Sequence, residues 1–108
     1  MIQLNIHEQP SGRISSFEMS GHADYAEHGK DLVCAAASAV SFGAVNAVIT
    51  LTGITPAITQ GEAGGYLKVV LPETDDDHDQ QLIVRAMIVS MQTIEQDYSK
   101  FIKITYTK

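Results

Sequence analysis

Residues 19–47 read MSGHADYAEHGKDLVCAAASAVSFGAVNA, and this stretch joins a polar, glycine-flanked segment to a long run without a charged side chain. Asp31, at the junction, is a favourable N-cap residue. Apolar residues then recur at helical spacing: Val33, Ala37, Val40, Ala44, Val48 and Leu51. The stretch therefore predicts a loop over residues 21–30, followed by a long helix that begins after Asp31 and ends at Gly53.

Segments of alternating polarity lie on both sides of this helix. Residues 2–8 and 14–20 alternate apolar and polar side chains around the turn QPSGR, which predicts an antiparallel hairpin. Residues 57–72 contain a glycine-rich turn and predict a second hairpin. Residues 102–107 alternate again and predict a last strand.

A second helix is expected between the second hairpin and the last strand. The acids of ETDDDHDQ precede it, as the positive end of a helix dipole favours, and it runs to about Ser99. Its predicted inward positions are these: Leu82, Ala86, Met87, Val89, Ser90 and Ile94. The order β-β-α-β-β-α-β predicts an α+β fold, with a small antiparallel or mixed sheet and two helices on one side of it.

Length and composition limit the classes of protein. A chain of 108 residues with 44% hydrophobic residues predicts a single domain over residues 1–108. The net charge of −6 and seven scattered Lys and Arg residues argue against direct binding to nucleic acid. One cysteine excludes an intrachain disulfide, and the N-terminal residues show no secretory signal, so we expect a cytoplasmic protein.

The charge-free run over residues 32–61 is long enough to span a membrane. Ser38, Ser41, Asn46 and Thr50 interrupt it, and neither an aromatic belt nor a basic cluster flanks it. We therefore predict no membrane association and a helix that is buried inside the domain.

Cys34 is the only cysteine, and it occupies the third helical position if Asp31 is the N-cap. At a helix start backbone N–H groups are unpaired and the dipole is positive, and both features stabilise a thiolate. His22, directly after a predicted strand, is a candidate proton carrier. Ser38 and Ser41 lie one and two turns further along and predict a polar stripe along which a pocket opens.

Gly21 and Gly29 predict a mobile loop that closes over a substrate and opens again. A purely structural interpretation stays open for Cys34, for the two serines and for Asp31. A lone cysteine is most often a small buried hydrophobe, Ser38 and Ser41 can bond to the preceding turn, and Asp31 can serve as a cap alone.

A zinc site is a second chemical alternative. His22, His28 and Cys34 are six residues apart, with Asp24 or Asp31 as a fourth ligand. However, the paired short spacings of structural zinc sites are absent, and a metal would hold the loop rigid. We rank this site below catalysis and expect neither a metal nor a cofactor.

The same stretch resembles the signature of the Prp family of ribosomal-processing cysteine proteases. Gly21, His22 and Ala23 match its GHA element. The element G-x-D-x-V-C-A-A-x-S is matched by the residues that follow: Gly29, Asp31, Val33, Cys34, Ala35, Ala36 and Ser38. The chain length and the predicted order of elements are also similar to those of the family.

The resemblance implies a cysteine endopeptidase whose catalytic residues correspond to Cys34 and His22. It further implies that the enzyme removes the N-terminal extension of a large-subunit ribosomal protein precursor and that it forms a homodimer. The acidic net charge agrees with a basic substrate.

In this mechanism the backbone N–H groups at the helix start, including that of Cys34, are candidate oxyanion donors. Asp31 and Ser38 are candidate supporting residues, and Asp31 either orients His22 or only caps the helix. Two other functions stay open: a non-catalytic module that binds a ribosomal-protein tail, and a structural subunit with an inert cysteine. A histidine that precedes a thiol at a helix start favours the protease.

Overall fold

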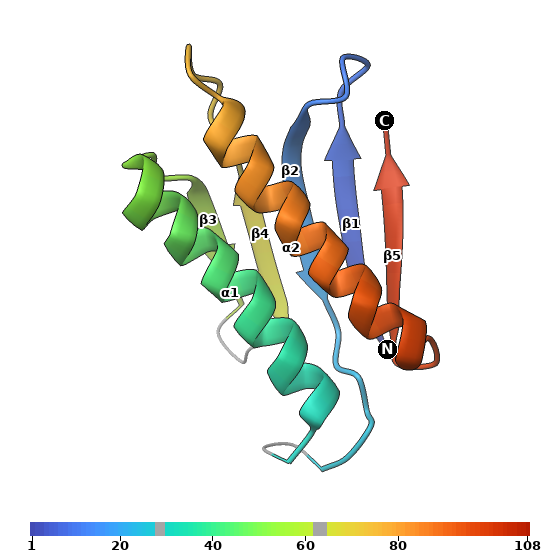
Figure 1. The fold of residues 1–108 in the computed structure, drawn as a ribbon. Coiled ribbons are helices and arrows are strands. Elements are labelled where there is room, and N and C mark those ends of the chain that lie inside the picture. Colours follow the sequence, from blue (N-terminus) through green and yellow to red (C-terminus); the bar gives the residue numbers. More distant parts are fainter. Residues whose placement is uncertain (28–29, 62–64) are drawn as a thin grey trace.

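The computed structural model describes residues 1–27, 30–61 and 65–108, and its elements follow the predicted order (Figure 1). The elements are β1 (Ile2–Glu8), β2 (Ile14–Ser20), α1 (Leu32–Thr52), β3 (Ala57–Gln60), β4 (Tyr66–Val70), α2 (His78–Asp97) and β5 (Ile102–Thr107). The predicted α+β class is therefore confirmed.

The strands form one sheet in the order β3-β4-β2-β1-β5. Neighbouring strands are antiparallel except for β5, which pairs with β1 in parallel, with Ile102 opposite Ile2. A parallel partner requires a crossover connection, and α2 supplies it. Both helices cover the same face of the sheet, as predicted (Figure 1).

The sheet has one buried face and one polar face. Along β1, the side chains of Ile2, Leu4 and Ile6 are buried, whereas those of Gln3 and His7 are exposed. The strand period of two places each set on one face. The buried set joins side chains from both helices in a single core.

Helix α1 begins and ends as predicted. Asp31 is its N-cap, and Gly53 ends it in the left-handed conformation, at φ 75°. Its buried residues are Val33, Ala37, Ser41, Val45 and Val48. Leu51, predicted to face the core, is 73% exposed, so the predicted inward face is wrong at this position. A helix that is apolar almost all round leaves no periodicity from which to choose its buried side.

Within the described ranges, α1 is the one helix that is long and apolar enough to cross a membrane, a property it shares with core helices of globular domains. The prediction of a buried helix holds for one side only, since 28% of its most apolar window is buried. The other residues of α1 are half-buried or exposed.

Helix α2 ends at Asp97, close to the predicted end, but it faces the core differently. Its buried residues are Gln80, Val84, Met87, Ile88 and Met91. Leu82 and Val89, predicted to point inward, are 57% and 60% exposed, and Ala86 and Ser90 are exposed as well, so the prediction is wrong at these four positions.

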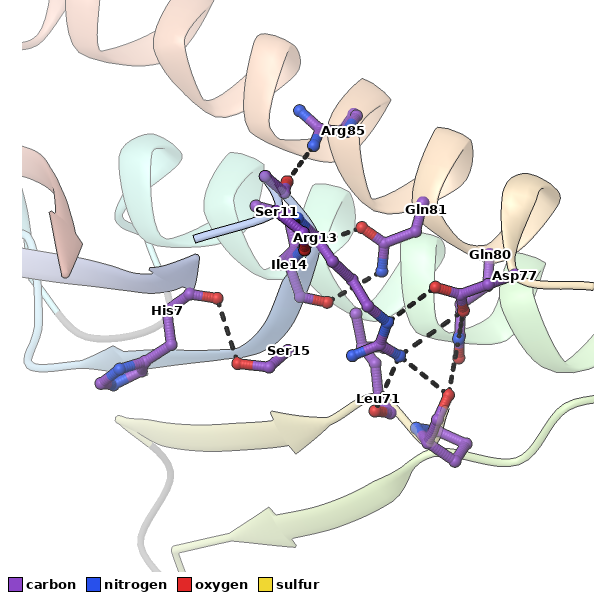
Figure 2. Close-up of polar contacts among 12 residues, drawn as sticks. His7, Ser11, Arg13, Ile14, Ser15, Leu71, Asp77, Gln80, Gln81 and Arg85 are labelled. Carbon is purple, nitrogen blue, oxygen red and sulfur yellow. Dashed lines mark hydrogen bonds and ion pairs between the residues drawn. The ribbon is translucent and has the colours of Figure 1, made fainter. Parts of the chain in front are cut away.

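A polar network explains why a glutamine occupies the core side of α2 (Figure 2). Arg13 donates from Nε to Asp77 at 2.7 Å and from Nη2 to the carbonyl oxygen of Pro72 at 2.9 Å. The Gln80 amide donates to Asp77 Oδ1 at 2.7 Å and to the same carbonyl at 3.1 Å. The network holds the start of α2 at the end of the molecule opposite the loop that follows β2 (Figure 1).

Candidate active site

The start of α1 is organised by the carboxylate of Asp31, which is only 8% exposed. Its Oδ1 accepts hydrogen bonds from the backbone N–H groups of Val33 and Cys34, both at 3.0 Å. Its Oδ2 accepts from those of Tyr25 and Ala26, at 2.8 and 3.2 Å. Asp31 therefore caps the helix, as predicted, and also ties the preceding loop to it.

Two opposing effects act on the pKa of Asp31. Burial raises the pKa, whereas hydrogen bonds from the N–H groups of Cys34, Ala26, Tyr25 and Val33 lower it, and together they leave it below the usual 3.8. The charged carboxylate is thus the form that stabilises this part of the fold.

We expect Asp31→Ala to lower Tm by about 5–10 °C at pH 7, because the substitution removes a cap and also frees the loop. The pH dependence has a defined sign. A carboxylate whose pKa is lower in the folded state stabilises the protein fully above its unfolded-state pKa, near 3.8. That stability is lost as the pH falls through the lower folded-state value.

Thermal unfolding of the wild type and of Asp31→Asn between pH 2 and 7 measures this effect. The difference in Tm should be full at pH 7 and should shrink below about pH 4. Asp79→Asn is the control, because Asp79 also lies in the first turn of a helix but its side chain is 71% exposed. Equal losses in the two variants would contradict the role of Asp31.

Cys34 and His22 line the same cavity. Cys34 is half-buried in the first turn of α1, and its Sγ accepts a hydrogen bond from the backbone N–H of Ala23 at 3.3 Å. His22 is exposed and lies immediately before Ala23. The cavity has a volume of about 500 Å³ and lies among the start of α1, the loop after β2 and the β3–β4 hairpin. The structure thus brings the two predicted residues to one site.

The walls of this cavity are largely apolar. Its lining includes Ile2, Met19, Ala35, Phe42 and Leu67. Sequence reasoning did not assign Phe42 to the site, although Phe42 lies two turns of helix after Cys34. Such a lining suits the apolar side chains of a peptide.

The predicted polar stripe ends at Ser38. Ser38 is exposed and lines the cavity, whereas Ser41 is fully buried and donates its hydroxyl to the carbonyl oxygen of Ala37 at 2.8 Å. The assignment of Ser41 to the pocket was therefore wrong. Its hydroxyl bonds to the preceding turn, as serines in helices often do.

The backbone N–H of Cys34 was also predicted as an oxyanion donor. This N–H and that of Val33 both donate to Asp31 in this structure, and their role as oxyanion donors stays a prediction. The cap satisfies the donors that the helix start would otherwise offer.

The loop that carries His22 is held at several points. Gly21 donates its N–H to the carbonyl oxygen of Gly65 at 2.9 Å. Tyr25 packs edge-on against Tyr98 and Phe101, with ring centroids 5.7 and 5.1 Å apart. They act together with the two hydrogen bonds that the loop donates to Asp31 and with the hydrogen bond from Ala23 to Cys34.

Gly21 has a structural reason to be glycine. Its φ is +86°, and a Cβ there would collide with the carbonyl oxygen of Met1. His28 and Gly29 lie outside the described residues. The mobility of the loop stays a prediction.

Gly65 is a site residue that sequence reasoning missed. Its φ is +74°, and a Cβ on it would lie 2.7 Å from Nε2 of His22. The glycine-rich turn before Tyr66 was recognised, but its contact with His22 spans more than forty residues of chain. A side chain at this position would displace the imidazole.

We expect Gly65→Ala to lower kcat/KM by roughly 100-fold, because displacing the imidazole of His22, the predicted proton carrier, by about 1 Å should have an effect of this size. Gly53→Ala is the matched control: its φ is also positive, at +75°, but its Cβ would meet nothing within 4 Å. Both variants should lose about 1–2 kcal/mol of stability from backbone strain. Peptide-cleavage assays measure the loss of activity, and thermal unfolding measures the loss of stability. Equal activities in the two variants would contradict a role of Gly65 in positioning His22.

Among the residues that the structure describes, no cluster of three or more His, Cys, Asp or Glu side chains has the arrangement of a metal site. His28, one member of the alternative zinc site, is outside those residues.

A comparison with protein families matches residues 1–103 to the cysteine protease Prp. The chain belongs to the Prp family. This confirms the resemblance inferred from the GHA and G-x-D-x-V-C-A-A-x-S elements, and it makes the protein a cysteine protease.

Relatives of the Prp family match over nearly their whole length. The ribosomal processing cysteine protease Prp of Bacillus subtilis (strain 168) is 50% identical over 108 residues, which covers 97% of this chain and 96% of the relative. The protein of the same name from Staphylococcus aureus (strain Mu50 / ATCC 700699) is 43% identical over 106 residues, with 98% and 99% covered.

Solved Prp structures are similar in fold. The S. aureus ribosomal processing protease Prp with a covalently linked product peptide has a TM-score of 0.94 and 43% identity, and 99% of this chain and 100% of that chain are covered. The S. aureus Prp with a substrate peptide has a TM-score of 0.88 and 42% identity, with the same coverage. The S. aureus protease therefore binds peptides on this fold.

Proposed function

We propose that Cys34 and His22 form a catalytic dyad that removes the N-terminal extension of a large-subunit ribosomal protein precursor. The main support is that the only thiol of the chain and His22 line one cavity with apolar walls. The names of the relatives, which are ribosomal processing proteases, support the class of substrate.

In the proposed reaction His22 takes the thiol proton of Cys34, and the sulfur attacks the scissile carbonyl carbon. The C–N bond breaks as His22 returns the proton to the leaving amine, and a thioester remains. A water molecule, deprotonated by His22, then attacks the thioester. The new carboxyl terminus leaves, and the thiol is restored.

The backbone N–H of Ala23 is the proposed oxyanion donor. It already lies 3.3 Å from Sγ, and the carbonyl oxygen of a substrate that bonds to this sulfur must come close to the same N–H. Transfer of this hydrogen bond from sulfur to the oxyanion would stabilise the tetrahedral intermediate. It replaces the helix-start donors that Asp31 occupies.

The acidic charge of the chain supports a basic substrate, because opposite charges speed encounter. Mass spectrometry of a precursor peptide incubated with the protein, or with Cys34→Ala, tests the proposal. We expect cleavage by the wild type alone. A peptide left intact by both, but bound by both, would favour a non-catalytic module that binds the ribosomal-protein tail.

We also propose that the protein forms a homodimer through its helical layer. Leu51, Leu82 and Val89 on the two helices are 73%, 57% and 60% exposed, and a second copy would cover them. The cytoplasmic location and the lack of nucleic-acid binding likewise stay predictions.

Sedimentation measurements test the dimer. We expect Leu82→Asp to shift the wild-type dimer towards monomer at micromolar concentration, because it would bury a charge in the interface. Val70→Asp is the control, since Val70 is 42% exposed on β4 and belongs to the helix-free face of the sheet. A monomeric wild type, or equal shifts in both variants, would contradict this interface.

A further inference from the structure

Strand β3 forms one edge of the sheet, beside the cavity. In the described part of the chain it pairs with β4 alone, and its four residues are all exposed. Gln60, its last residue, and Gly61, the next, both line the cavity that contains Cys34. The edge therefore leads directly to the proposed nucleophile.

The hydrogen bonds of the hairpin show which backbone groups point outward. The N–H of Gly61 donates to the carbonyl oxygen of Tyr66 at 3.2 Å, so this pair is a hydrogen-bonded one. The register continues as Gln60 opposite Leu67 and Ile58 opposite Val69. Because bonded and non-bonded pairs alternate in antiparallel strands, the N–H and C=O groups of Ile58 and Gln60 point away from β4.

The four residues of β3 include no charged side chain and no proline. Exposed edges are commonly protected by lysine or proline, and β3, with the sequence AITQ, contains neither. The opposite edge, β5, carries Lys103. An edge with unprotected backbone groups is a template for an extended peptide.

We propose that the substrate peptide adds a strand to the free edge of β3, with its backbone bonded to Ile58 and Gln60, and so delivers its scissile bond to the cavity. This inference rests on the proposed protease function and deepens it.

The strand geometry adds a preference for side chains. Every second side chain of the peptide would point to the face of the sheet that α1 covers, where Ile58 and Phe42 are 40% and 37% exposed. The substrate should therefore be apolar at alternate positions beside the cut.

The first test replaces an outward N–H. Ile58→Pro removes this donor without removing a bond to β4, and Ile58→Ala is the matched control that keeps the N–H. We expect KM for the precursor peptide to be about fivefold higher in the proline variant than in the alanine variant, with kcat within about twofold. Thermal unfolding and the alkylation rate of Cys34 verify that the fold and site are intact.

The second test leaves the protein unchanged and applies even if the proline variant does not fold. Each backbone nitrogen of the precursor peptide is methylated in turn, and KM is measured with the wild type. Strand addition predicts that methylation raises KM at every second position of the peptide, since only alternate N–H groups bond to β3.

Strand addition would be overturned if the peptides are cleaved but KM does not alternate with the methylated position, and if the two Ile58 variants have equal KM values. The protease function would then stay in place. A wild type that cleaves no precursor peptide would instead overturn the proposed function itself.

Discussion

Replacement of Cys34 by serine is expected to lower kcat/KM by about 10⁴-fold or more and to leave the fold intact. Removal of the proposed nucleophile blocks the route through the covalent thioester. The serine oxygen can still accept the Ala23 N–H that the sulfur accepts at 3.3 Å. Tm should therefore change by less than about 3 °C, which thermal unfolding measures alongside peptide cleavage.

Chemical modification gives an independent control. The chain contains one cysteine, so Cys34 is the one thiol that iodoacetamide can alkylate. We expect activity to disappear in proportion to the fraction of protein labelled. Turnover above about one-hundredth of the wild-type value in Cys34→Ser, or in fully labelled protein, would assign the nucleophile to another residue.

Replacement of His22 by alanine is expected to lower kcat by roughly 10³-fold, because general acid–base catalysis contributes about 10²–10⁴. The ring is exposed and lines a cavity of about 500 Å³, so free imidazole can enter the space it leaves. We expect added imidazole to restore part of the activity of this variant and to have no effect on Cys34→Ser. Steady-state cleavage assays across imidazole concentrations measure this rescue.

His7 provides the matched control for His22. It is also exposed, but it lies on β1 and on the polar face of the sheet. His7→Ala should retain the activity of the wild type. If His22→Ala keeps more than about a tenth of the wild-type kcat, or gains nothing from imidazole, His22 does not transfer the proton.

The strands were the most predictable part of the fold. A period of two is visible in the sequence of β1, β2, β4 and β5, and these strands occur where alternation predicted them. Strand β3 was predicted only as a short extended piece before the glycine-rich turn. The parallel pairing of β5 with β1 depends on where α2 returns the chain, which no local pattern records.

The buried sides of the helices were less predictable, for two physical reasons. Helix α1 is apolar around most of its circumference, so Leu51 and Val45 could not be distinguished by spacing. Helix α2 buries Gln80 because its amide N–H donates to nearby Asp77, which in turn pairs with Arg13, a residue distant in sequence. Hydrophobic periodicity cannot anticipate a buried glutamine.

In the candidate site, too, local features could be predicted and long-range contacts could not. The position of His22 and Cys34 at one cavity and the capping role of Asp31 were predictable, because a motif and a helix start are local features. The N–H of Ala23 on the sulfur and the contact between Gly65 and His22 were not, since both depend on how the loop lies on the sheet and on α1.

The one-sided sheet has a consequence for mutational tolerance. Strands β1 and β5 contribute only every second side chain to the core, so sensitivity to substitution should alternate along each of them. Ile2, Leu4 and Ile6 would tolerate little, whereas Gln3 and His7 would accept many side chains. Substitutions should therefore accumulate on the polar face of the sheet, while the face that the helices cover stays nearly constant.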